Sequence, residues 1–233
     1  MFPGGYAQTS LSVDDRSSSG NTTADEGGVY ARFIPGPWFF NASVAYSANS
    51  NDNSRTVAFP GIDEQANASF NSHVITGFAE AGYTYKPQAS FSLEPSVSIR
   101  ESNLQQDGYT ETGAPGLDLM VGDQSLNSTV SSIGMRLSHI FLESSAHPAT
   151  LGARAAWEHE LGSTDDLVTA QFADAPGASF TVQGTPRPRN SAAMGVDGRV
   201  DLSKNLQAFA NYSATLGTDE SIQEILGGLL LKW

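Results

Sequence analysis

The last thirteen residues of the chain, Ser221 to Trp233, alternate between two faces in the manner of a β-strand. Successive side chains of a strand point to opposite faces, so positions two apart share a face. One face holds Ile225, Gly227, Leu229, Leu231 and Trp233, and the other holds Glu224, Gly228 and Lys232, with Leu226 and Leu230 as exceptions. A last strand that ends on an aromatic residue is typical of outer-membrane β-barrels, where the aromatic lies in the interfacial girdle. The stretch therefore predicts a membrane-spanning strand.

The composition narrows the class of protein further. No run of about eighteen apolar residues is present, which excludes a helical membrane span. Barrel strands alternate apolar and polar residues, so a hydrophobic content of 39% is compatible with a membrane protein. The net charge of -13 argues against nucleic acid as a partner, because phosphates require a basic surface. The chain has no cysteine, hence no disulfide and no thiol chemistry.

Nine further segments alternate in the same way, which gives ten predicted strands. They lie at about 5–13, 26–34, 38–47, 72–86, 90–101, 132–138, 151–160, 192–203 and 206–216. No helical period competes with these alternations. Pro95 has no N–H for a ladder hydrogen bond, so it is expected close to the start of its strand. The sequence therefore predicts an antiparallel all-β fold over a single domain, residues 1–233.

The connections between these segments fall into two kinds. Short turns are expected at 34–37, 87–89 and 204–205, with a slightly longer one at 141–147. Long loops rich in Gly, Ser, Asn, Asp and Thr are expected at about 14–25, 48–70, 102–126 and 161–190. Alternating short and long connections are typical of bacterial barrels, which have tight periplasmic turns and long extracellular loops. This pattern predicts a transmembrane up-and-down β-barrel with its C-terminus on the periplasmic side, and it assigns much of the negative charge to solvated loops.

Charged residues on the faces opposite the apolar ones separate a barrel from a soluble β-sandwich, which also alternates. A barrel with a watery lumen accepts charges on its inner face while its apolar face contacts lipid. We predict that these charges face the lumen and pair across strands. They are Glu80, Glu94, Arg100, Arg136, Arg154, Glu158, Glu160, Asp197 and Arg199.

Several motifs resemble the translocator β-domain of autotransporters, the type V secretion proteins of Gram-negative bacteria. Residues 155–162, Ala-Ala-Trp-Glu-His-Glu-Leu-Gly, are similar to the Trp-x-His-Glu strand of that family. Similar stretches follow at 178–186, at Ala192, at 202–206 and at Asn211-Tyr212, with weaker ones at 80–83 and 93–95. The resemblance is specific over about the last 80 residues and extends to the strand pattern before them.

The resemblance implies a barrel of twelve strands, threaded by a helix that joins it to an N-terminal passenger. Since ten strands are recognisable here, the first two are expected to precede Met1, as is the signal peptide that export requires. The implied function is to anchor in the outer membrane and to help export the passenger through or beside the lumen. The implied partners are outer-membrane lipid, the barrel-assembly machinery and the protein's own passenger segment.

Motifs for catalysis or metal binding are absent from the sequence. There is no Gly-x-Ser-x-Gly elbow, no phosphate-binding glycine loop and no His-Glu-x-x-His. The four histidines are dispersed, which favours structural roles. Glu158 and Glu160 share a face, as paired catalytic carboxylates would, but a role as lumen acids is favoured. We therefore expect no enzyme activity, no metal and no cofactor in this chain.

The terminal residues carry one more implied role. Trp233, Leu231 and Leu229 resemble the signal by which the barrel-assembly machinery recognises its clients, although the family more often has an aromatic at the position of Leu231. A lipid-facing strand end explains the same residues and is compatible with that role. Two alternatives to a translocator remain: a small porin-like or adhesin-type barrel whose loops bind a ligand, and a membrane anchor for a catalytic passenger.

Overall fold

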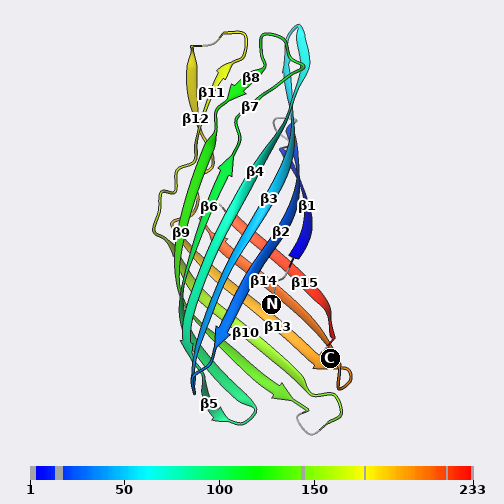
Figure 1. The fold of residues 1–233 in the computed structure, drawn as a ribbon, viewed down its shortest axis with the longest axis vertical. Coiled ribbons are helices and arrows are strands. Elements are labelled where there is room, and N and C mark those ends of the chain that lie inside the picture. Colours follow the sequence, from blue (N-terminus) through cyan, green and yellow to red (C-terminus); the bar gives the residue numbers. More distant parts are fainter. Residues whose placement is uncertain (1–3, 14–17, 143–144, 176, 219, 232–233) are drawn as a thin grey trace.

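The computed structural model describes residues 4–13, 18–142, 145–175, 177–218 and 220–231. Most of them form one antiparallel, strongly curled sheet in which strands adjacent along the chain lie side by side (Figure 1). Ten strands form its path, and β5 (Tyr85–Gln88) pairs with β6 beside it. The path runs β1 (Gly4–Val13), β2 (Ser18–Phe33), β3 (Trp38–Phe59), β4 (Ile62–Tyr83), β6 (Phe91–Gln106), β9 (Gln124–Phe141), β10 (Ala149–Glu160), β13 (Asn190–Asp201), β14 (Leu206–Gly217) and β15 (Glu220–Leu231).

This architecture confirms the predicted all-β antiparallel fold and its ten recognisable strands. Within the described residues, the path begins at β1 and ends at β15, and no pairing joins these two strands. The described chain also has no helix long and apolar enough to cross a membrane. The short connections and the end of β15 lie at the same end of the sheet (Figure 1). That arrangement agrees with the predicted alternation of short and long connections.

The convex face of the sheet carries a continuous apolar band. On β3 the side chains of Phe40, Val44 and Tyr46 are exposed, whereas that of Phe39 on the opposite face is buried. The other exposed apolar side chains of the band include Val29, Phe33, Ile75, Val97, Ile99, Ile133, Met135, Leu137, Leu151, Trp157, Met194, Val196, Tyr212, Leu216, Ile225, Leu229 and Leu231. A strand such as Trp38 to Tyr46, tilted as in membrane barrels, covers a height of about 20 Å, which is most of the apolar band of about 25 Å in such barrels. The band is therefore suited to contact lipid.

Pro95 lies where the ladder on one side of β6 changes partner. Leu93 pairs with Tyr85 of β5, whereas Ser96 pairs with Gly82 of β4, so Pro95 lies between the two ladders. A residue without an N–H is tolerated at such a break because no ladder bond is required there. Its position in the first third of β6 agrees with the expectation that it lies near the strand's start.

The regions expected to be long loops contain β-structure: 48–70 is almost entirely a hairpin, 18–25 belongs to β2, and short strands occur within 102–126 and 161–190, so the expectation of long loops was wrong for the first two regions and incomplete for the others. Strands β3 and β4 continue to a tight turn at Pro60-Gly61, where Gly61 has φ +92°. A second, four-stranded sheet contains β7 (Tyr109–Thr110), β8 (Leu119–Val121), β11 (Leu167–Phe172) and β12 (Ser179–Gln183). A backbone bridge between Asn67 and Thr112 joins this second sheet to β4. The apolar alternation is lost in these segments because water can reach both faces above the membrane.

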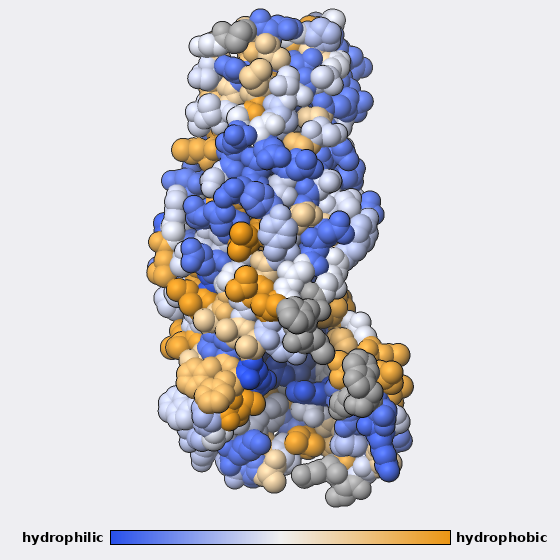
Figure 2. Space-filling view, viewed as in Figure 1, coloured by the Kyte–Doolittle hydropathy of each residue, from blue (hydrophilic) through white to orange (hydrophobic). Residues whose placement is uncertain are grey.

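We call this region, built from the upper parts of β1 to β4 together with β7, β8, β11 and β12, the upper tier. Hydrophilic residues dominate the upper half of the molecule, and hydrophobic ones gather in the lower half (Figure 2). The upper tier has a small core, formed by Ala66, Ala68, Ala114, Val121 and Ala170. Arg55 of β3 donates two hydrogen bonds to the buried Glu111 carboxylate, which also accepts the N–H of Leu119. A packed core and a satisfied ion pair make the upper tier an ordered extension of the sheet.

Strand β1 belongs to the upper tier and not to the apolar band. Its residues Gly4 to Val13 pair with Gly27 to Ser18 of β2, which leaves the lower part of β2, residues 28–33, with β3 as its described partner. A strand above the lipid needs no apolar face, which explains why apolar and polar residues alternate only weakly in the sequence of β1.

Candidate functional site

The concave face of the sheet encloses a polar cavity of about 940 Å³. Side chains from every strand of the path except β1 line it, because inward positions alternate with the lipid-facing ones. Eight of the nine predicted lumen charges lie in this lining: Glu80, Glu94, Arg100, Arg136, Arg154, Glu158, Asp197 and Arg199. The lining also includes Arg32, Phe39 and Glu224, which sequence reasoning placed on strands but did not single out. The alternation of β2 and β15 was the signal that could have identified Arg32 and Glu224.

The strongest ion pair of the cavity joins two strands that are not neighbours. The Nη2 atom of Arg136 on β9 lies 2.6 Å from both carboxylate oxygens of Asp197 on β13, so the bridge spans β10. Gly152 of β10 lies beneath it, and a Cβ there would come within 2.6 Å of Asp197 Oδ1 and 2.7 Å of Arg136 Nη2. The absence of a side chain at Gly152 is therefore what allows the two charges to meet.

Other acids of the cavity have partners as well, on an adjacent strand, on the 84–85 connection or, for Glu158, across the intervening β9. Glu80 accepts a hydrogen bond of 2.7 Å from Asn41, and Glu94 accepts one of 3.1 Å from Thr84. Glu158 lies 3.8 Å from the guanidinium of Arg100. These contacts orient the carboxylates along the wall, and their solvent access keeps them hydrated.

Phe39 is the one large apolar side chain of the lining that is buried, at 4% exposure. Its ring covers Gly82 on β4, where an added Cβ would lie 2.2 Å from Phe39 Cζ. The guanidinium of Arg32 lies 5.6 Å from the centre of the same ring, at cation–π distance. A glycine and an aromatic on adjacent strands thus fill the wall at this level.

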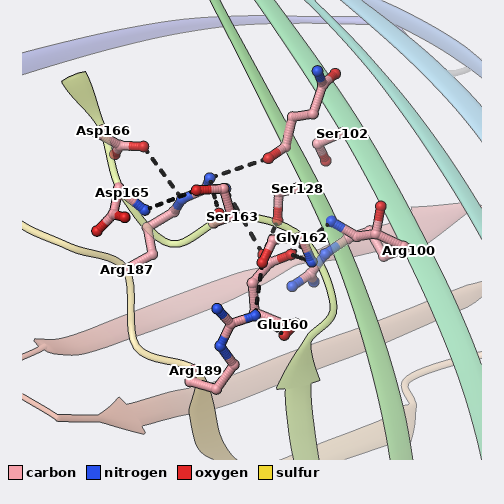
Figure 3. A network of polar contacts seen from close by, with 12 residues as sticks. Arg100, Ser102, Ser128, Glu160, Gly162, Ser163, Asp165, Asp166, Arg187 and Arg189 are labelled. Carbon is pink, nitrogen blue, oxygen red and sulfur yellow. Dashed lines mark hydrogen bonds and ion pairs between the residues drawn. The ribbon is translucent and has the colours of Figure 1, made fainter. Parts of the chain in front are cut away.

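Glu160, the ninth predicted lumen charge, lies beyond the cavity at the upper end of β10. The apolar outward residues of β10 end at Trp157, and the next outward residue, His159, is polar, which places Glu160 above the membrane-spanning part. Its side chain accepts hydrogen bonds from the Ser128 hydroxyl and from the N–H groups of Thr129 and Gly162 (Figure 3). The prediction that it lines the open lumen was wrong because these donors bury it to 4% exposure.

Burial raises the pKa of Glu160, but the three hydrogen bonds and the nearby charge of Arg187 outweigh it, so the pKa lies below its ordinary value. Two arginines complete this rim network (Figure 3). Arg187 donates to the carbonyl oxygens of Asn127 and Ser163, at 3.1 and 2.9 Å, and Arg189 donates to those of Glu160 and Gly162, at 2.9 and 2.7 Å. The network fastens both ends of the 161–190 segment to β9 and β10. Sequence reasoning missed both arginines because they lie outside any alternating segment.

The terminal strand has the expected orientation in its described part. Leu229 and Leu231 are 68% and 63% exposed on the convex face, opposite Ala208 and Leu206 of β14. Trp233 lies outside the described residues. No group of His, Cys, Asp and Glu that could hold a metal ion occurs among the residues described. Glu158 faces Arg100 in the cavity, whereas Glu160 is bound to Ser128 at the rim, so the two carboxylates do not share one site.

A curled antiparallel sheet with an apolar convex face and a charged concave one is the wall of a membrane β-barrel. The family model "Autotransporter beta-domain" matches residues 3–213. The chain therefore belongs to the autotransporter β-domain family, whose members are translocators embedded in the outer membrane and are typically non-catalytic.

Relatives agree with this assignment. The chain is 25% identical over 230 residues to an extracellular serine protease of Serratia marcescens, and the alignment covers 98% of this chain and 21% of that protein. It is 24% identical over 234 residues to esterase EstA of Pseudomonas aeruginosa, with 98% of this chain and 35% of EstA covered. The chain thus spans between a fifth and about a third of these relatives.

A solved structure supports the fold. The translocator domain of autotransporter NalP from Neisseria meningitidis superposes with a TM-score of 0.74 at 20% identity, over 93% of this chain and 69% of that translocator-domain chain.

Proposed function

We propose that this chain forms most of the wall of an outer-membrane pore that a passenger segment of the same polypeptide crosses or occupies during export. The observation that carries the proposal is the cavity of about 940 Å³, lined by nine strands, seven of which contribute charged side chains, and surrounded by an apolar convex face. A polar lumen keeps a polypeptide hydrated, and the apolar band anchors the wall in lipid. The chain itself supplies no chemistry in this proposal, and it uses no cofactor.

Closure of the wall requires further strands. The edge of β15 and the lower edge of β2 expose backbone groups at the level of the apolar band, and hydrocarbon does not tolerate such edges. We propose that two additional strands pair with these edges and complete a twelve-stranded barrel. The outward Leu229 and Leu231, together with Trp233, are proposed to guide the barrel-assembly machinery to β15.

The test uses this chain behind a secretion signal, preceded by the two closing strands of the NalP translocator and an epitope tag before them. A translocator should bring the tag to the cell surface, so protease added to intact cells should remove it. Mobility on gels, unheated against boiled, reports whether the barrel has closed. A heat-modifiable barrel whose tag stays protected until the outer membrane is opened would refute a role in export.

A further inference from the structure

Two arginines of the cavity have no partner of opposite charge in the described chain. Arg154 on β10 and Arg199 on β13 have no carboxylate within 4.0 Å and make no hydrogen bond to a described residue. Both side chains are exposed to the cavity that they line. The wall formed by β10 and β13 therefore has two positive charges available to a ligand.

The acids near Arg154 have other partners. In register, Arg136 lies opposite Glu94 of β6 on one side and opposite Arg154 of β10 on the other, and its ion pair is with Asp197. Glu94 accepts a hydrogen bond from Thr84, and Glu158 is turned to Arg100. Arg154 is left beside another arginine, an arrangement that is unfavourable unless an anion compensates it.

The environment of Arg199 is similar. Its cross-strand neighbours in register are Thr150 on β10 and Phe209 on β14, and neither carries a charge. Arg154 is level with Gly195, four positions along β13 from Arg199, which separates the backbones of the two arginines by about 13 Å along the strands. We therefore treat each arginine as a separate anion site.

We propose that Arg154 and Arg199 bind carboxylate side chains of the polypeptide segment that occupies the lumen. This inference rests on the proposed export function, and it specifies that the segment is acidic on the side that faces β10 and β13. A guanidinium is suited to this task because its planar donors can hold a carboxylate through two parallel hydrogen bonds. Arg154 leans over Gly195, where an added Cβ would lie 2.7 Å from its Nε atom, so the guanidinium lies flat against the wall and leaves the lumen open.

The test measures peptide binding in lipid nanodiscs to the closed barrel, formed by this chain preceded by the two closing strands of the NalP translocator. The probes are three short labelled peptides of one sequence that carries two glutamates, two glutamines or two lysines. At low ionic strength, where charges are little screened, the glutamate peptide should bind about tenfold more tightly than the glutamine peptide for each arginine engaged. Fluorescence anisotropy gives the dissociation constants.

The double variant Arg154→Gln, Arg199→Gln should lose the preference for the glutamate peptide, and Arg154→Lys, Arg199→Lys should keep part of it. Arg32→Gln is the matched control, because it removes a lumen cation that is already engaged with Phe39. A preference that persists in the double variant overturns the inference, as does an equal loss in Arg32→Gln, which would indicate a response to net charge alone. A chain that neither inserts nor displays the tag would overturn the export function, and the carboxylate sites with it, whereas a displayed tag with no glutamate preference would overturn only the sites.

Discussion

The bridge between Arg136 and Asp197 offers the sharpest test of how the lumen wall is held together. Replacing Asp197 by asparagine keeps the size of the side chain and removes its charge. Arg136 then loses its ion pair across β10, keeps at most the neutral amide oxygen as an acceptor, and remains next to Arg154. We therefore expect the variant to be less stable than the parent chain.

The magnitude follows from the exposure of the pair. Removing one partner of a fully buried ion pair costs about 3–5 kcal/mol, whereas exposed pairs contribute about 1 kcal/mol or less. The side chains of Arg136 and Asp197 are 32% and 17% exposed, so the bridge lies between these limits, at about 2 kcal/mol. The like-charged neighbour Arg154 adds up to about 1 kcal/mol once the bridge is gone.

The assay is reversible unfolding by guanidinium in lipid vesicles, followed by tryptophan fluorescence, with all variants made in the barrel that the two NalP strands close. Asp197→Asn should lower the unfolding free energy by about 2–3 kcal/mol. The control is Asp25→Asn, an exposed acid of β2 without an ion pair in the described chain, and it should change stability by less than about 0.5 kcal/mol.

Gly152→Ala supplies an independent check, because its Cβ would intrude between the two charges. If Asp197→Asn and Gly152→Ala are both as stable as the parent, the bridge does not stabilise the wall.

Three further predictions concern other parts of the sheet. Gly82→Ala should destabilise the wall by about 1–3 kcal/mol in the same unfolding assay, since the Phe39 ring and the Pro95 carbonyl must move, whereas Gly77→Ala, with nothing within 4 Å of its Cβ, should be close to neutral. Glu160 has a lowered pKa, so its stabilisation of the rim is complete above its ordinary value of 4.5 and is lost as the pH falls through the lowered value. Hydrogen exchange of residues 161–190 should accordingly be faster in Glu160→Gln near neutral pH, and a difference that persists in strong acid would contradict this. Trp233→Asp should reduce the heat-modifiable barrel in the outer-membrane fraction, and undiminished barrel would exclude the assembly-signal role.

The sequence was sufficient for the strands of the apolar band. On strands such as β3 and β10, lipid on one side and water on the other impose a strict two-residue period, which the alternation from Trp38 to Tyr46 displays. The same alternation could assign inward charges such as Arg136 and Asp197 to a face, but it could not show that the two form a pair. Their contact depends on Gly152, which lies on the strand between them, and the sequence alone does not give the register that places Gly152 there.

The upper tier could not be predicted because the physical signal is missing there. Once the strands leave the lipid, both faces are wet, and Asn, Ser and Thr occur on either of them. The order of this region comes from contacts that are distant in sequence, such as the pair of Arg55 and Glu111 and the bridge of Asn67 and Thr112. Glu160 shows the limit of the prediction. Its position in the alternation of β10 indicated a lumen-facing side chain, but Arg187 and Arg189 hold the 161–190 segment against it.

The two faces of the wall contribute differently to the specificity of the fold. Lipid excludes a register shift of one residue, which would turn the inward charges to it, but it accepts any apolar side chain at a given depth and so restricts a shift of two residues only weakly. The inner pairs are selective against that shift, because moving β13 by two residues would keep Asp197 in the lumen and leave Arg136 without its partner. The charges of the lumen therefore have two roles in this reasoning. They keep the passage hydrated, and they fix the register that keeps the apolar band continuous on the other side of the same strands.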